Sequence, residues 1–328
     1  MNRRDLIAFF CGAAAWPPAA LAQQAVRMRR VGVLMAYDES DQEAKTRVTM
    51  FRERLQELGW TDGRNIQLNI RWATGSEKIS NLAQELAASQ SDVILSSTTP
   101  TTEALLRHTR TIPIVFATVA DPIGSGFVTS LPRPGGNTTG FTNVEGSMAG
   151  KWLELLKQIA PRVDRVALLF NPATAPYAQI YIEPFGDAAA ALDVEPIVIP
   201  VSDTSELEAA VAALASTPNG GLMLMPGPFM SNRSEQIISL TARNRLPAVF
   251  PFRYYAEFGG LLSYGSDQHD NYRRAAAYVD RILRGDKVGE LPVQAPVKFA
   301  LTINLKTAKA LGLTVPPALL AQADEVIE

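Results

Sequence analysis

Apolar positions along this chain alternate between short continuous runs and longer amphipathic stretches. The run at residues 31–35 predicts a buried strand, and the helical spacing of Val48, Phe51 and Leu55 predicts a helix over residues 44–58. Further strands are predicted at residues 66–70, 93–95 and 114–116, and further helices at residues 79–88 and 101–109. This order is typical of right-handed βαβ units with a parallel sheet.

The same alternation then starts again in the second half of the chain. Its predicted helices are residues 146–159, 178–192, 207–214 and 234–243, and its predicted strands are residues 166–170, 196–199, 222–224 and 248–250. A helix at 271–283, a strand at 299–303 and a helix at 305–311 follow. We therefore predict an α/β protein with two doubly wound, Rossmann-like lobes, each built on a parallel sheet.

Three glycine- or proline-rich breaks, at residues 132–140, 257–260 and 285–296, interrupt this order. We interpret 132–140 as a loop and place the crossings between lobes near residues 143, 260 and 294. The predicted N-terminal lobe comprises residues 23–143 plus 261–293, and the predicted C-terminal lobe comprises residues 144–260 plus 294–328. Three crossings make a three-strand hinge, and such hinges permit closure around a ligand.

Residues 1–22 have a basic start, an apolar middle and a small-residue end, as in a secretory signal peptide. We expect cleavage near Ala22 and a soluble chain in the periplasm. The adjacent Arg3 and Arg4 suit a twin-arginine signal, and an ordinary Sec signal with two arginines is the alternative. Cys11 lacks the small-residue context of a lipid-anchored cysteine.

Composition and motifs exclude several classes of function. A formal net charge of −2 with scattered charges leaves no basic footprint for nucleic acid. The only cysteine lies inside the predicted signal, and two histidines are too few for most metal sites, so we expect no metal and no cofactor. The nucleophile elbow, the P-loop and the zinc-protease motif are all missing from the sequence, which argues against an enzyme.

Candidate binding residues follow the predicted strands, because ligands of parallel α/β sheets bind at the carboxyl ends of the strands. The clearest candidate is the hydroxyl-rich stretch 96–102, whose side chains and free N–H groups suit a carboxylate; helix capping is the alternative. Asp121 would either cap a helix that begins at Pro122 or bind an ammonium group. The full candidate set is Tyr37, Asp38, Ser97, Thr98, Thr99, Thr118, Asp121, Asn171, Tyr177, Pro226, Phe229, Phe252 and Tyr264.

Aromatic residues recur on these strand-end loops in both halves of the chain. Tyr37, Tyr177, Phe229 and Phe252 either pack as ordinary loop aromatics or line a pocket for a planar or apolar ligand. His108 and His269 are predicted on helices, at a solvated face and in a first turn, without a catalytic role.

Several segments together resemble the periplasmic substrate-binding proteins of one ABC-transporter family. They are the runs at residues 30–35, 112–116 with 121–122, 133–140, 259–265, 303–313 and 323–328. The resemblance implies a type I periplasmic-binding fold, relatives that bind tryptophan or tyrosine, and a ligand carboxylate facing Ser97, Thr98 and Thr99. Tryptophan-type relatives tend to carry an acidic residue near the position of Phe252, and its absence favours an aromatic acid or another small anion as much as an amino acid.

We therefore expect a monomer that captures a small ligand (an amino acid, an aromatic acid or a similar small anion) and delivers it to an ABC permease in the inner membrane. An extracytoplasmic sensor domain needs the same cleft and remains the alternative. A secreted hydrolase is disfavoured because no nucleophile–base pair is evident in the sequence.

Overall fold

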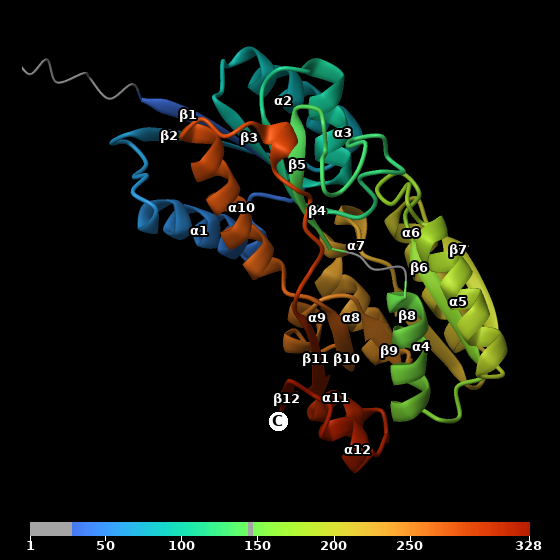
Figure 1. Ribbon diagram of the computed structural model, residues 1–328. Helices are drawn as coiled ribbons and strands as arrows, with labels where there is room; N and C mark the ends of the chain where they lie inside the picture. The colour runs from blue at the N-terminus through green and yellow to red at the C-terminus, as the bar shows by residue number, and fades with distance from the viewer. Residues whose placement is uncertain (1–27, 144–146) are drawn as a thin grey trace, which may run out of the picture.

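The computed structural model describes residues 28–143 and 147–328 of the chain, so the predicted signal peptide lies outside the described residues. The described chain forms two α/β lobes, each with its own sheet (Figure 1). Part of the predicted first crossing, residues 144–146, also lies outside the described residues.

The N-terminal lobe is built on a parallel five-stranded sheet, ordered β2-β1-β3-β4-β5. Its strands are β1 (Arg29–Met35), β2 (Ile66–Trp72), β3 (Val93–Thr98), β4 (Ile114–Val119) and β5 (Thr138–Thr142). Helices α1 (Gln42–Glu57) and α10 (Gln268–Leu283) cover one face, and α2 (Ser76–Ala88) and α3 (Thr99–His108) cover the other. Strand β1 serves both cores, because Val33 faces α1 and α10 while Leu34 faces α2 and α3.

The C-terminal lobe has a seven-stranded sheet, ordered β12-β11-β10-β9-β8-β6-β7, in which only the β10–β11 pair is antiparallel. Its strands are β6 (Arg165–Phe170), β7 (Glu195–Pro200), β8 (Gly220–Leu224), β9 (Ala248–Phe250), β10 (Leu262–Ser266), β11 (Phe299–Asn304) and β12 (Glu325–Ile327). Side chains of β6 alternate between two cores, with Leu168 on one face and Leu169 on the other.

Helices cover both faces of this second sheet. Helices α4 (Met148–Ile159) and α5 (Gln179–Ala191) cover the face that Leu168 contacts, and the helices of the opposite face are α6 (Thr204–Ala215), α7 (Pro228–Ser231), α8 (Ser234–Arg243) and α9 (Arg253–Glu257). Short segments η1 (Val288–Glu290), α11 (Leu305–Ala310) and α12 (Pro317–Leu320) complete the chain. The α/β class, the doubly wound parallel sheets and the two-lobe architecture are confirmed.

Two predictions about the breaks are wrong. Residues 138–140, predicted as the end of a loop, belong to β5, where the buried Thr138 and Thr139 donate hydroxyl hydrogen bonds to the carbonyls of Phe127 and Leu291. Residues 261–265, predicted in the N-terminal lobe, lie in the C-terminal lobe, where β10 pairs with β9 and β11. The break at 259–260 is a turn within that lobe, with Gly259 at φ +107°, and the chain crosses between β10 and α10 instead.

Candidate functional site

A small cavity lies between the lobes, at the carboxyl ends of β3 and β4 and beside the loops that follow β6, β8 and β9. Its free volume is about 10 Å³, close to the space that one water molecule needs. Among the described residues, no charged side chain lines it: the lining residues are Tyr37, Thr98, Thr99, Thr118, Asn143, Tyr177, Gly227, Pro228, Ser231, Phe252 and Gln268.

Both lobes contribute to this cavity, and the structure brings together six of the predicted residues there. They are Tyr37, Thr98, Thr99, Thr118, Tyr177 and Phe252. The N-terminal lobe supplies the three threonines, whereas Tyr177 and Phe252 come from the C-terminal lobe. The predicted meeting of hydroxyl and aromatic side chains is therefore present at one point.

The hydroxyl-rich loop performs two tasks at once. Thr98 is the N-cap of α3, and its N–H donates to the Thr101 hydroxyl at 2.9 Å. The hydroxyls of Thr101 and Thr102 both donate to the Thr98 carbonyl at 2.9 Å. Thr99 accepts a hydrogen bond from the Ala120 N–H at 3.3 Å. The inner hydroxyls thus hold the loop, while Thr98 and Thr99 line the cavity at the positive end of α3.

The two cavity tyrosines have neutral hydroxyls. Burial raises the pKa of Tyr37 and of Tyr177 above the ordinary tyrosine value. The Tyr177 hydroxyl donates to the Pro226 carbonyl at 2.9 Å, which fixes its ring across the cavity. Both rings therefore offer apolar faces and uncharged hydroxyls to a ligand.

A buried arginine that the sequence analysis missed lies against the ring of Tyr37 and is not itself part of the cavity lining. Arg47 of α1 is 1% exposed, and its guanidinium lies 5.0 Å from the ring centre of Tyr37 and 5.5 Å from that of Tyr254 in the other lobe. Its Nε donates to the Glu43 carboxylate at 3.2 Å. Arg47 therefore joins an aromatic ring of each lobe through its charge.

Glu43 is shared between Arg47 and His269 of α10, whose ring nitrogen lies 2.9 Å from the same carboxylate oxygen. Burial raises the pKa of Glu43, but the hydrogen bond to His269 and the charge of Arg47 outweigh burial and lower it to about 2. The hydrogen bond to Glu43 raises the pKa of His269. His269 lies in the first turn of α10, as predicted, and has this ion-pair role.

The remaining predicted residues lie outside the cavity lining, each with a local partner. Asp38 accepts from the Ser40 N–H, Asn171 accepts from the Thr174 N–H, and Asp121 accepts from the Gly124 N–H. Asp121 therefore caps a turn, and residues 122–126 do not form the predicted helix.

The other candidates outside the lining serve packing or backbone contacts. Ser97 accepts from the Ala36 N–H at 2.9 Å, and Pro226 contributes its carbonyl to Tyr177. Phe229 packs against Arg233, and Tyr264 against Phe299.

Five lining residues were missed by the sequence analysis. They are Asn143, Gly227, Pro228, Ser231 and Gln268. Three of them belong to the loop and short helix after β8, a region that the sequence analysis had already singled out through Pro226 and Phe229. Asn143 and Gln268 lie at two of the three crossings between lobes, where a single polar residue has no recognisable motif.

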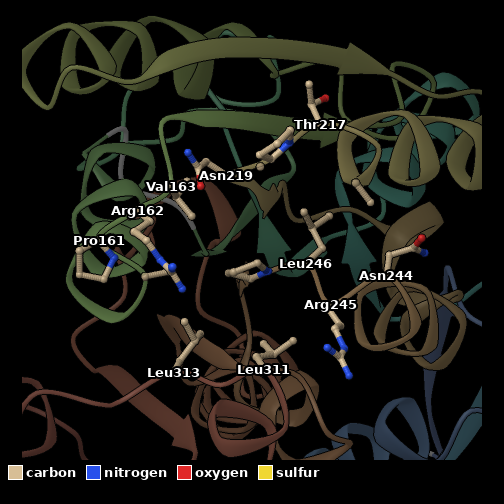
Figure 2. A pocket seen from close by; sticks show the side chains of 15 residues that line it. Pro161, Arg162, Val163, Thr217, Asn219, Asn244, Arg245, Leu246, Leu311 and Leu313 are labelled. Atoms are coloured by element: carbon tan, nitrogen blue, oxygen red, sulfur yellow. The ribbon is translucent and has the colours of Figure 1, made fainter.

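A larger pocket of about 300 Å³ lies at the opposite, amino end of strands β6, β8 and β9 (Figure 2). Arg162, Asn219, Arg245, Leu246 and Leu311 are among its lining residues, and all lining residues belong to the C-terminal lobe. We call it the distal pocket.

Residues 28–143 and 147–328 offer neither a cluster of metal ligands nor a membrane-spanning helix. These residues contain no group of three or more His, Cys, Asp or Glu side chains placed to hold a metal ion. None of the helices in the same ranges is long and apolar enough to span a bilayer.

Comparison with known proteins identifies relatives over nearly the whole chain. A tyrosine-binding protein of Clostridioides difficile (strain R20291) is 26% identical over 265 residues, which cover 80% of this chain and 75% of that protein. A conserved domain protein from Vibrio cholerae has 26% identity and a TM-score of 0.85, over 92% of this chain and all of that structure. An ABC domain from Streptococcus pneumoniae in complex with L-Trp has 24% identity and a TM-score of 0.84, with the same coverage.

The family described as ABC transporter substrate binding protein matches residues 33–327. Apart from the first four residues of β1, this range includes both sheets, and it includes every residue of the interlobe cavity. The chain therefore belongs to the ABC transporter substrate-binding protein family.

Proposed function

We propose that this ABC substrate-binding protein captures a small aromatic solute bearing a carboxylate in its interlobe cavity and delivers it to the permease of the importer. The observation that carries the proposal is the lining itself: threonine hydroxyls beside the start of α3 meet aromatic rings from both lobes. Membership of an ABC transporter substrate-binding family favours a role in transport over a role in signalling.

The aromatic part of the ligand would lie between Tyr37, Tyr177 and Phe252. All three side chains are buried, and they come from opposite sides of the cavity. A space of about 10 Å³ admits only a water molecule, so the lobes must separate before a ligand enters. Closure would then bury the apolar surfaces of the ligand and of these rings, which supplies binding free energy.

The carboxylate would lie against Thr98, Thr99 and Thr118. A helix N-terminus favours an anion because its N–H groups are free and the helix dipole is positive there. α3 is ten residues long and begins at this loop. The tyrosine-binding relative from Clostridioides difficile supports a ligand that combines a carboxylate with an aromatic ring.

We place the protein in the periplasm as a monomer without catalytic activity, after removal of residues 1–22. The family supports an extracytoplasmic location and a partner in the ABC transporter.

Binding can be tested with the chain from Gln23 onward, by a thermal-shift screen followed by calorimetric titration. The panel would hold tyrosine, tryptophan, phenylalanine, benzoate and ribose. We expect the aromatic carboxylates to raise the melting temperature, since a ligand at 100 times its Kd adds about 2.7 kcal/mol to stability. A response to ribose alone, or to none of the panel, would contradict the proposed ligand class.

Delivery needs a separate experiment in cells. Deletion of the gene should abolish uptake of the labelled ligand identified in vitro, and expression of the full chain should restore it. Uptake that is unchanged by deletion would argue against a transport role for that ligand.

A further inference from the structure

One charged contact joins the two lobes outside the interlobe cavity. The guanidinium of Arg47, on α1 of the N-terminal lobe, lies 5.5 Å from the ring centre of Tyr254, on α9 of the C-terminal lobe. Both side chains are buried, with exposures of 1% and 5%. Neither residue lines the cavity, so the contact is made between the lobes themselves and lies outside the space for a ligand.

Within its own lobe, Arg47 is held in place by two neighbours. Its Nε donates to the Glu43 carboxylate at 3.2 Å, and its guanidinium lies 5.0 Å from the ring centre of Tyr37. Its Nη1 is buried without a hydrogen-bond partner. A buried charge with an unpaired donor needs further compensation, and the negative face of an aromatic ring supplies it. Tyr254 is the part of this compensation that comes from the opposite lobe.

Within the C-terminal lobe, Tyr254 is held by residues of the cavity wall. Its hydroxyl lies 3.0 Å from Oγ of Ser231, and its ring stacks on Phe252 with centres 6.0 Å apart. Both of these neighbours line the cavity. Next to Ser231, Nδ2 of Asn232 donates across the lobes to the Ala36 carbonyl at 3.2 Å. The charged contact therefore lies where the cavity walls of the two lobes meet.

Separation of the lobes would break the contact with Tyr254 and leave the ion pair intact. Arg47, Glu43 and Tyr37 belong to one lobe and stay together, whereas Tyr254 moves away with α9. A cation over an aromatic ring changes an equilibrium roughly 2- to 30-fold. Because release of any ligand from the cavity requires the lobes to open, this factor applies to every ligand alike.

We propose that Arg47 and Tyr254 form an interlobe latch, a single cation–π contact that stabilises the closed arrangement of the lobes and slows release of whatever ligand the cavity holds. Arg47 is a positioning residue here, since it acts on a ligand only through the lobes. The lining residues determine which ligand binds, and the latch determines how readily the lobes open. This inference goes beyond the proposed function because it does not depend on the identity of the solute.

The decisive comparison is Tyr254→Leu against Tyr254→Phe. Leucine removes the aromatic face, whereas phenylalanine keeps it and loses only the hydroxyl contact with Ser231. The ratio of closed to open chains can be measured without ligand, by energy transfer between dyes on Lys78→Cys and Ala212→Cys, one exposed position on each lobe. The chain from Gln23 onward contains no other cysteine.

Tyr254→Leu should lower the closed-to-open ratio roughly 2- to 30-fold, and Tyr254→Phe should keep the wild-type ratio. With L-tyrosine and L-tryptophan as probes, stopped-flow dissociation from Tyr254→Leu should accelerate by one common factor of the same size. A defect in the cavity lining would instead change the two dissociation rates unequally.

Arg47→Gln tests whether the positive charge is what Tyr254 contacts. Glutamine keeps an N–H donor for Glu43 and removes the charge. In this background Tyr254→Leu should have little further effect, as in a double-mutant cycle of two contacting residues. The matched control is Arg284→Met, which removes a cation 5.7 Å from the ring centre of Trp60 within the N-terminal lobe and should change neither the ratio nor the dissociation rates.

Melting curves establish that each variant is folded, and the comparison at Tyr254 decides by itself if Arg47→Gln is not. An unchanged ratio and unchanged dissociation in Tyr254→Leu would overturn the latch, as would equal losses in Tyr254→Leu and Tyr254→Phe. A loss that persists in full in the Arg47→Gln background would also overturn it. Failure of both amino acids to bind would contradict the proposed function alone, because the ligand-free ratio still tests the latch.

Discussion

The interlobe cavity is much smaller than the distal pocket, yet only the interlobe cavity is lined by residues of both lobes. The distal pocket is far larger, about 300 Å³ against about 10 Å³, yet all its lining residues belong to one lobe. Its arginines Arg162 and Arg245 are exposed, and none of its lining residues carries a buried polar atom without a partner. The interlobe cavity has two such atoms, which are contributed by two crossings.

The distal pocket can be explained by the turns that connect helices to strands. Asn219 and Arg245 precede β8 and β9 and have φ values of +60° and +50°, the left-handed region used in tight turns. In a hinged protein the volume of a cavity between lobes changes as the lobes separate or close. The volume of a pocket within one lobe does not depend on that movement. Burial and contributions from both lobes therefore identify a site of this kind better than volume does.

Matched arginine substitutions should give the largest difference between the two regions. Arg47→Ala removes one partner of a buried ion pair and should lower the free energy of unfolding by about 3 kcal/mol. Arg162→Ala, at an exposed position of the distal pocket, should change it by less than about 0.5 kcal/mol. Urea denaturation measures both, and equal losses would show that Arg47 has no special role between the lobes.

Threonine substitutions in the interlobe cavity and in the distal pocket should differ in their effect on ligand affinity. Thr98→Ala combined with Thr99→Ala should weaken carboxylate binding at least tenfold, because each hydrogen bond to a charged group contributes about 1.5–3 kcal/mol. The melting temperature should fall modestly through loss of the N-cap, which contributes about 1 kcal/mol. Thr217→Ala in the distal pocket is the control and should leave affinity unchanged. Unchanged affinity in the double variant would show that this loop only caps α3.

The ion pair between Glu43 and His269 should make the free energy of unfolding depend on pH. The pKa of Glu43 is about 2 in the folded chain against 4.5 ordinarily, so its contribution is present above pH 4.5 and is lost as the pH falls toward 2. The pKa of His269 is raised above 6.5, so its contribution is present below 6.5 and is lost as the pH rises through the raised value.

The pair therefore stabilises the fold most between about pH 4.5 and 6.5. Relative to Glu43→Gln, the wild-type chain should lose roughly 1–2 kcal/mol between about pH 5 and pH 3, measured by denaturation at each pH. His269→Gln should remove the loss on the alkaline side. Parallel pH profiles of wild type and Glu43→Gln would contradict the assignment.

The smallest effect is expected from Arg245→Gly in the distal pocket. Glycine adopts a positive φ without strain, so stability should rise by less than about 1 kcal/mol and ligand affinity should not change. A clear change in affinity would mean that the distal pocket communicates with the cavity, and would weaken the comparison above.

Sequence periodicity predicted most of the helices and strands because their cores are apolar runs at regular spacing. It missed β5, since threonine hydroxyls bonded to carbonyls replace apolar side chains as the buried surface there. It assigned β10 to the wrong lobe because a glycine turn within a lobe and a crossing between lobes have the same composition.

The candidate site was predicted as far as strand-end position determines it. Thr98, Tyr177 and Phe252 follow strands, and the topology brings them together. Arg47 was missed because it precedes Val48 on an amphipathic helix, and its burial depends on a tyrosine from the opposite lobe. Asn143 and Gln268 were missed because they reach the cavity lining only through the positions at which the chain crosses between lobes.

The return of the chain to the N-terminal lobe also affects how that lobe folds. Helix α10 packs beside α1 (Figure 1), and Trp60 donates to Asp280 across 220 residues of sequence. The core around Phe51 is therefore incomplete until α10 has been synthesised. Such high contact order slows folding, because loop closure must precede the stabilising contacts. A chaperone that shields the face of the first sheet normally covered by α10 would meet the longest-lived exposed apolar surface of the nascent chain.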